Sequence, residues 1–281
     1  SLYKDQLNSK LETCWEKSGN LTQLLFSNDQ KNQNQAEEDM IIALNNIQVS
    51  ARHILTLKKH LDKHSSEVFS HIPSAVKMAS HCLDALKDTS EAFMRIVYHN
   101  INRFVSMQVE KVSGPQALGS LLERFGQQSY EVQEREYASS EANDTYIPSL
   151  LRALELVHKG MKDKMTEANL ELMLHALATS VVKRIEAFAM RKSFTFWGGL
   201  KFDKDIRKIS GFFNGLCSRP VRTKFSRLMQ IGSLLQVDKV EEILDYWTSD
   251  AQVWRLSPRE VKLVLSLRLE FSKDEISKLK L

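Results

Sequence analysis

The sequence predicts an all-α fold in which elongated helical bundles are stacked as a rod, with a larger bundle followed by a small C-terminal helical domain. Ten glycines and five prolines in 281 residues are few for a β-rich domain, which needs many turns. Apolar residues instead recur at helical spacing over long segments. The hydrophobic fraction of 42% is too high for a disordered chain.

The N-terminal region, residues 1–36, is expected to contain a leading helix and a polar linker. Residues 2–26 have weak helical periodicity, and residues 27–39 are polar without large aliphatic side chains, as in a loop or a disordered linker. The chain begins without Met and without the apolar core of a signal peptide. We therefore expect a segment cut from a longer protein, and the helical ending suggests a natural C-terminus.

The next region, residues 37–197, is expected to form a bundle of long helices. Apolar residues from Ile47 to Leu61 recur at steps of 4, 3, 3 and 4, which places them on one helix face. This helix should end near Pro73. A second helix is expected over about 74–112, where a Ser-Gly-Pro turn stops it.

The second half of this bundle is expected to contain two further helices. One should cover about 116–137 and be followed by a turn at 139–144. The other has apolar residues at steps of 4, 3, 4, 4, 3 and 4 from Leu150 to Leu172 and should continue to about Arg191. At roughly 1.5 Å per residue, such a helix would be longer than about 60 Å.

Two glycines after Trp197 are expected to break the chain, because paired glycines release the backbone. We place the boundary of a small helical domain, residues 198–281, at this point. Before the boundary, Met161 and Met165 lie at core spacing, and we interpret them as packing residues rather than as a ligand site.

Three capping signals are expected to begin helices in the small domain, near Lys239, Pro258 and Lys273. In each, an Asp or a Ser is followed three residues later by a Glu, which matches the capping box. The three pairs are Asp238 with Glu241, Ser257 with Glu260, and Ser272 with Glu275.

Positive charge is concentrated in the last third of the chain. Residues 192–281 hold 17 Lys and Arg against 11 Asp and Glu, a net charge of +6, whereas the preceding residues hold 22 against 24, a net charge of −2. Four cations form a broad helix face and are a possible partner surface: Arg219, Arg222, Lys224 and Arg227. This face would suit anionic lipid or nucleic-acid phosphates, or it is simply the solvated side of a core helix.

Arg227 is expected to form a structural ion pair with Glu260. A guanidinium is a rigid fork that suits carboxylates, and a small domain cannot bury much surface. Glu260 would complete the cap of Ser257 and still have an oxygen for Arg227. The simpler interpretation is that Glu260 serves the cap alone.

No pattern of catalytic residues, metal ligands or phosphate-binding glycines is evident, and we expect neither an enzyme nor a cofactor. Three distant cysteines without a CxxC motif indicate reduced thiols. His60 and His64 lie one helical turn apart, with Glu67 a further turn away, but the HExxH motif is absent. A zinc site needs at least three protein ligands.

The segment from Leu200 to Leu281, with LKFDKDIRKI, RPVRTKFSRLMQIGSLLQVDKVEEILDYW and WRLSPREVKLVLSLRLEFSKDEISKLKL, resembles the end of the subunit-four family of the conserved oligomeric Golgi complex. ALNNIQVSARHILTLKKHLD at 43–62 and EAND at 141–144 are similar to earlier parts of the same family. The resemblance covers about residues 37–281 and is strongest after Phe194.

This resemblance implies a non-enzymatic scaffold of a helical-rod vesicle-tethering complex, peripheral on the cytosolic face of the Golgi membrane. Such subunits assemble with partner subunits and act in retrograde intra-Golgi transport and Golgi maintenance, together with SNAREs, SNARE regulators and small GTPases. Two alternatives remain: a module that binds anionic membrane or nucleic acid through the basic face, and a helical hydrolase or metalloenzyme around His60 and His64.

Overall fold

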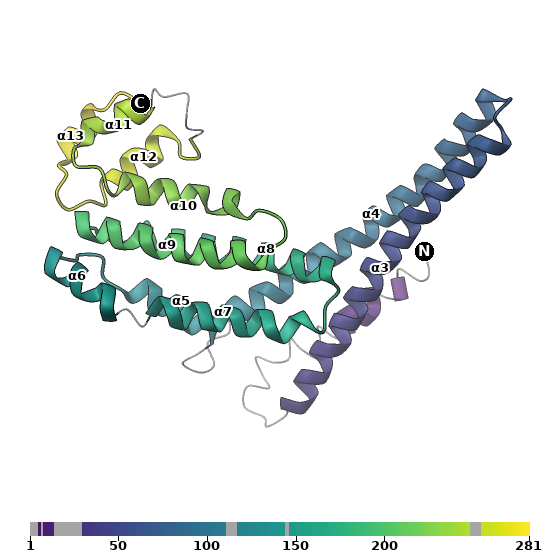
Figure 1. Cartoon of the computed structure of the whole chain (residues 1–281), viewed down its shortest axis with the longest axis horizontal. Coiled ribbons are helices and arrows are strands. Elements are labelled where there is room, and N and C mark those ends of the chain that lie inside the picture. Colours follow the sequence, from purple (N-terminus) through teal and green to yellow (C-terminus); the bar gives the residue numbers. More distant parts are fainter. Residues whose placement is uncertain (1–4, 7, 14–29, 111–116, 144–145, 248–253) are drawn as a thin grey trace. The chain divides into compact units, whose positions relative to one another are not determined.

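A computed structural model describes residues 5–6, 8–13, 30–110, 117–143, 146–247 and 254–281. The described residues form helices α3–α13 and one short 3-10 turn, and none of them forms an extended strand, so the predicted all-α fold is confirmed (Figure 1). Among these residues, no helix combines the length and the apolar content that crossing a bilayer requires. The chain divides into two compact units: unit 1 comprises Ser1–Phe104 and Lys159–Met173, and unit 2 comprises Val105–His158 and Leu174–Leu281.

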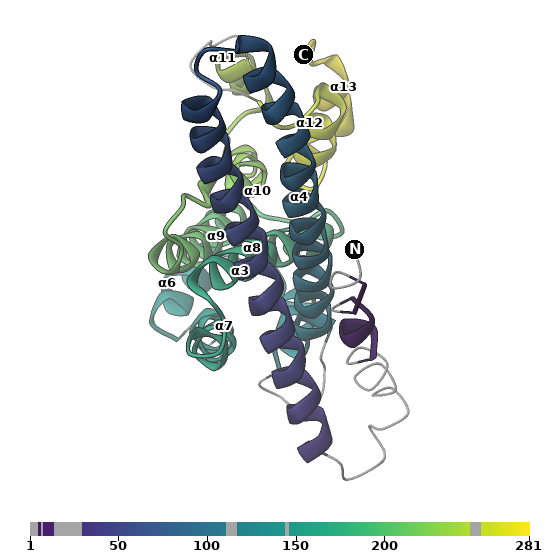
Figure 2. The same cartoon turned by 90° about the vertical axis from the view of Figure 1, so that its right-hand side faces the viewer.

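Unit 1 is built on the antiparallel helices α3 (Gln30–Val68) and α4 (Pro73–Glu110), which lie side by side in both Figure 1 and Figure 2. Helix α4 begins with a proline, which suits the first helical position. The expected end of α3 before Pro73 is therefore confirmed. The apolar core between the helices comes from Met40, Ile41, Leu44, Ile47, Ala51, Phe93, Val97, Ile101 and Phe104.

The polar segment expected to be a linker is helical from Gln30 onward, which corrects the expectation for 30–39. Its Gln, Glu, Lys and Ala residues have good helix propensity, and the apolar stripe that begins at Ala36 and Met40 anchors the helix. The leading helix is described only over 5–6 and 8–13, which are helical.

The prediction of one long helix from Leu150 to Arg191 is wrong. Two helices occupy this segment: α7 (Tyr146–Lys162) and α8 (Glu167–Ala189). Asn45 of α3 accounts for the break. Its side-chain amide donates to the carbonyl of Lys164 at 2.7 Å, and its oxygen accepts from the backbone N–H of Thr166 at 3.0 Å. A tertiary contact thus satisfies backbone groups that a continuous helix would have paired internally. Met161 and Met165, each 7% exposed, are core residues.

The helix expected over 116–137 is also interrupted, because α5 (Leu118–Gln127) and α6 (Glu134–Asn143) are separate. The intervening segment pairs with distant chain instead: the N–H of Thr195 donates to the carbonyl of Tyr130 at 3.2 Å. Phe194 in turn exchanges backbone hydrogen bonds with Leu267 and Leu269. Residues 139–143, expected to be a turn, lie in α6.

Unit 2 continues through six further elements: α9 (Phe196–Leu216), α10 (Arg222–Leu234), the 3-10 turn η1 (Val240–Glu242), α11 (Ile243–Trp247), α12 (Pro258–Leu265) and α13 (Lys273–Lys278). Buried aromatic rings dominate its core. They belong to Phe125, Tyr130, Phe194, Phe202, Phe213 and Phe225. The Tyr130 ring stacks on Phe194 and meets Phe202 edge-on, with ring centroids 5.2 and 5.5 Å apart.

Gly198 and Gly199 begin a helix rather than break the chain. They lie in the first turn of α9, where Thr195 caps the helix by accepting from the N–H of Gly198 at 3.1 Å. A Cβ at Gly198 would lie 1.7 Å from the Tyr130 carbonyl oxygen, and one at Gly199 would lie 2.3 Å from that of Leu235. Both glycines thus permit close backbone contacts inside unit 2. The boundary expected after Trp197 lies within this unit, and the three-part division of the chain stays a prediction.

Candidate functional site

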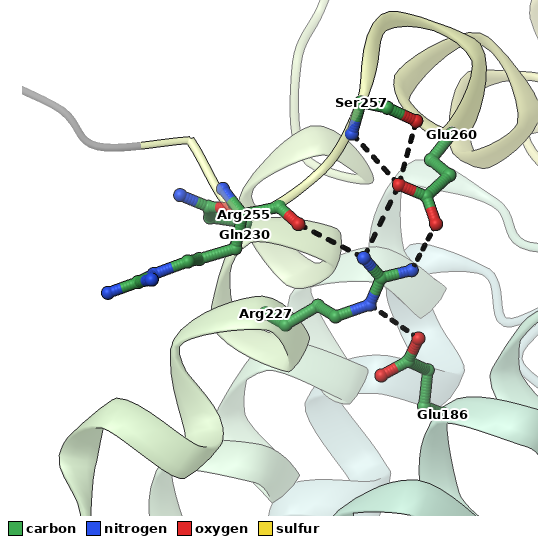
Figure 3. A network of polar contacts seen from close by, with 6 residues as sticks. All are labelled: Glu186, Arg227, Gln230, Arg255, Ser257 and Glu260. Atoms are coloured by element: carbon green, nitrogen blue, oxygen red, sulfur yellow. Dashed lines mark hydrogen bonds and ion pairs between the residues drawn. The ribbon is translucent and has the colours of Figure 1, made fainter.

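Arg227 of α10 connects three elements of unit 2 through one guanidinium (Figure 3). Its Nη2 donates to Glu260 Oε1 at 2.6 Å and its Nη1 to Oε2 at 3.3 Å, which is the two-pronged geometry that suits a carboxylate. Its Nε donates to Glu186 Oε1 at 2.6 Å. Its Nη1 also donates to the carbonyl oxygen of Arg255 at 3.0 Å. The structure therefore brings together the two residues that the sequence singled out.

Glu260 serves the α12 cap and the ion pair at once. Its Oε2 accepts from the backbone N–H and from the hydroxyl of Ser257, both at 2.8 Å. The hydrogen bond from Arg227, followed by those from Ser257, lowers the pKa of Glu260 from 4.5 to about 2. The hydrogen bonds to Glu260 and Glu186 outweigh burial and raise the pKa of Arg227 above its usual value. Both groups are therefore charged at neutral pH.

Glu186 completes the network from α8, and sequence reasoning missed it. Its side chain is 22% exposed, and its carboxylate pairs with the Nε of Arg227, separately from the carboxylate of Glu260. The contact spans 41 residues of sequence, and no local motif marks Glu186 as a partner. Together the contacts link α8, α10 and the start of α12 (Figure 3).

The carbonyl of Arg255 is held in place by a second polar contact. The N–H of Arg255 donates to Gln230 Oε1 at 2.8 Å, and Gln230 is buried on α10 one turn after Arg227. Two residues of α10 therefore bind both backbone polar groups of Arg255. This arrangement fixes the chain immediately before the α12 cap.

The basic face is smaller than the sequence suggested, because Arg227 and Lys224 are half-buried and bind other residues of unit 2. Arg227 is engaged as described, and Lys224 Nζ donates to Thr179 Oγ1 at 2.9 Å. Arg222 is exposed at the first residue of α10, and Arg219 is exposed before the helix begins. Phe225 on the opposite face is fully buried, as expected for a core helix.

Two of the three expected capping boxes are present. Ser257 and Glu260 form one at α12, and Ser272 and Glu275 form another at α13.

The box expected between Asp238 and Glu241 does not form. Lys239 occupies the cap position of a 3-10 turn, and the N–H of Asp238 donates to Glu242 at 3.2 Å rather than to Glu241. A 3-10 turn has about three residues per turn instead of the 3.6 of an α-helix, which changes the residue that faces the cap.

A second arginine network, around Arg268, was not foreseen. Arg268 is 4% exposed and donates to the carbonyl oxygens of Leu235 at 2.7 Å and Val237 at 3.1 Å, just after α10 ends. Its Nε donates to Glu270 at 2.9 Å. Burial opposes ionisation of Glu270, but hydrogen bonds from Arg268 and from the Phe196 N–H outweigh it, and the pKa of Glu270 is lowered.

The Arg227 and Arg268 networks hold elements of unit 2 together. In both networks, each arginine joins carboxylates and carbonyl oxygens from different elements of unit 2. His60 and His64, which the sequence offered as metal ligands, occupy exposed positions on α3 in unit 1.

Comparisons with known proteins point to one family. The family model "Conserved oligomeric Golgi complex subunit 4, C-terminal" matches residues 40–263. Proteins named conserved oligomeric Golgi complex subunit 4 are similar to the chain. The one from Arabidopsis thaliana is 36% identical over 245 residues, which cover 86% of this chain and 32% of the relative. The one from Homo sapiens is 28% identical over 252 residues, covering 88% and 32%. The chain spans about a third of the length of these relatives.

Proposed function

This chain belongs to the family described as conserved oligomeric Golgi complex subunit 4, C-terminal, and on that premise we propose that it is a non-enzymatic interaction scaffold of a multisubunit vesicle-tethering complex. The match over residues 40–263 is the observation that carries the proposal. The complex would act in retrograde intra-Golgi transport and Golgi maintenance. Its other subunits would be the direct partners of the full-length protein.

The polar networks of unit 2 support a scaffold. A surface that binds partners must keep its shape while it is exposed, and small helices hold little apolar contact area of their own. Helices α11, α12 and α13 have five, eight and six residues. The Arg227 and Arg268 networks compensate by linking the start of α12 and the segment after it to α8, α9 and the end of α10. We propose that residues 198–281 depend on them for a fixed surface.

SNAREs, SNARE regulators and small GTPases are further proposed partners of the assembled complex. We also propose a peripheral location on the cytosolic face of the Golgi membrane, reached through the other subunits.

Direct binding to anionic membrane or nucleic acid through the basic face has less support. Only Arg219 and Arg222 of the four cations keep exposed positions, whereas Lys224 and Arg227 bind other residues of unit 2. We expect no salt-sensitive binding of the purified chain to vesicles of anionic lipid or to DNA. Strong binding that falls steeply with salt would favour this alternative.

Affinity capture tests the scaffold proposal. The full-length protein that carries this chain would be tagged, captured from cells and analysed by mass spectrometry. We expect the other subunits of the Golgi complex among the captured proteins in comparable amounts. Recovery of the tagged protein without any of them would refute the proposal.

A further inference from the structure

The outer half of the α3–α4 hairpin contains no buried residue. Within the described range 30–110, the buried core of the hairpin ends at Ala51 of α3 and Ser90 of α4, where the hydroxyl of Ser90 donates to the carbonyl of Ala51 at 2.8 Å. Every residue from 52 to 89 is exposed or half-buried. Most of the stability of helices in proteins comes from packing of an apolar face. These two half-helices contact each other and have little else to pack against within unit 1.

Apolar side chains are nevertheless frequent on this outer half. On α3, Leu57 is 50% exposed, Leu61 39% and Val68 58%, and with His64 they follow steps of 4, 3 and 4. On α4, Met78 is 72% exposed. Steps of 4 and 3 place residues on one face of a helix, and this is the spacing of a helix-packing seam. Within the described part of unit 1, the hairpin thus presents a seam that α4 covers only in part.

The seam borders a groove between the two helices. The hollow measures about 440 Å³. Its walls include Leu61, His64, Val68 and Phe69 from the end of α3, and Cys82 and Leu83 from α4. Apolar atoms dominate these walls, and grooves of this kind between helices receive the apolar face of an amphipathic helix.

The outer half of the hairpin carries a net positive charge. Residues 52–89 hold six lysines and arginines against four acidic residues, a net charge of +2, and five histidines. Two of the four acidic residues, Asp62 and Asp84, pair with Lys58 at 2.7 and 3.5 Å. An incoming helix with carboxylates beside its apolar face would therefore be favoured, whereas a second copy of the hairpin would bring like charges together.

We propose that this groove binds an amphipathic helix of another subunit of the Golgi complex, with acidic residues flanking the apolar face of that helix. The inference rests on the proposed function, because it takes the partner from the same complex. The partner's apolar residues would recur at i, i+4 and i+7 and lie between Leu61, Val68 and Cys82.

Site-specific photo-crosslinking in the assembled complex tests the proposal. The photoreactive residue p-benzoylphenylalanine would replace Phe69, which lines the groove and is 40% exposed. A matched control would carry it at Lys63, whose side chain is 78% exposed and points about 160° away from Leu61 around α3. Both forms would be purified as part of the complex, irradiated and analysed by mass spectrometry.

We expect position 69 to crosslink to an acidic amphipathic helix of another subunit, and position 63 to give at most a trace of that product. A crosslink to a second copy of this chain, to another segment of the same protein, or to no protein would overturn the inference. In each of these cases the other subunits still co-purify, so the proposed function stands. Failure to recover those subunits at all would instead contradict the proposed function.

Binding of the crosslinked segment as a synthetic peptide gives a second, quantitative test. Leu61→Asp places a charge in the groove and should weaken binding by about tenfold or more. Ser66→Asp adds the same charge about 140° around α3 and should leave binding within about twofold. Raising the salt concentration should weaken binding to the unsubstituted chain. Circular dichroism would verify that both variants stay helical, and equal affinities for the two variants would contradict the proposal.

Discussion

At the scale of residues, Arg227 and Glu260 show how one pair can serve both a helix cap and a tertiary link. The cap of α12 needs one carboxylate oxygen, and the second oxygen remains for the guanidinium. Sequence reasoning could propose this pair because the capping box marks Glu260 within three residues of Ser257. It could not propose Glu186, because nothing local to α8 marks that residue.

Arg227→Trp should destabilise unit 2. The substitution leaves Glu186 and Glu260 without their cation and places a bulky ring among α8, α10 and α12. Because the pair is only partly buried, we expect a loss of about 2 kcal/mol, between the values for exposed and buried pairs. A lower melting temperature and faster proteolysis of residues 198–281 would show it.

The control for this prediction is Arg222→Trp, since Arg222 lies exposed on the same helix. It should change the melting temperature little. If the Arg227 variant and the unsubstituted chain had equal melting temperatures and equal rates of proteolysis, the structural role of Arg227 would be contradicted.

Glu260 should also make stability depend on pH in the acid range. Its pKa is about 2 in the folded chain and near 4.5 when unfolded, so the unfolded state binds the proton first as the pH falls. The contribution of the ionised carboxylate is thus complete above about pH 4.5 and is lost between there and about pH 2.

Urea unfolding from pH 6 to pH 3 measures this dependence. Glu260→Gln should lower stability at pH 6 and flatten its decline toward pH 3, whereas Glu241→Gln, at an exposed residue outside any formed capping box, should leave the curve unchanged. Parallel curves for Glu260→Gln and the unsubstituted chain would contradict the assignment.

At the scale of elements, local signals predicted helix starts better than they predicted helix continuity. The caps at Ser257 and Ser272 depend on residues three positions apart, which the sequence displays directly. The break between α7 and α8 depends on Asn45, which is 119 residues away from Lys164. The apolar periodicity of the sequence continues through this break, because both helices bury apolar side chains. Periodicity alone therefore predicted one helix.

The start of α9 offers a test of close packing between elements. At Gly199 an added Cβ would meet the Leu235 carbonyl oxygen at 2.3 Å, so Gly199→Ala forces α9 away from the end of α10. We expect a loss of about 2 kcal/mol in the free energy of unfolding, as for other overpacked sites. Urea unfolding would measure the change.

Gly211→Ala on the same helix is the matched control. Apart from the adjoining residues and backbone of α9 itself, no atom lies within 4 Å of a Cβ at that position, and alanine favours the helix. This variant should be equal in stability to the unsubstituted chain or more stable by up to about 1 kcal/mol. If both variants had the same stability, the close contact would not matter to the fold.

At the scale of the whole molecule, the all-helical class and the family followed from the sequence, whereas the division into units did not. The low glycine and proline content and the long apolar periodicity are properties of many residues together. A wrong assignment of one residue therefore does not change the predicted fold class. The division depends on which helices meet, as when Lys159–Met173 joins α3 in unit 1. Function is even less local, because a scaffold is defined by partners whose contacts leave no motif of their own.

The most direct test of the scaffold role compares the full-length protein with a form that lacks residues 40–281, which include the family match. Both would be tagged, captured from cells at equal expression and quantified together with the other subunits of the Golgi complex. If the chain is a scaffold, the intact protein should capture the full set and the truncated form should lose at least one subunit. Equal recovery of every subunit by both forms would contradict it.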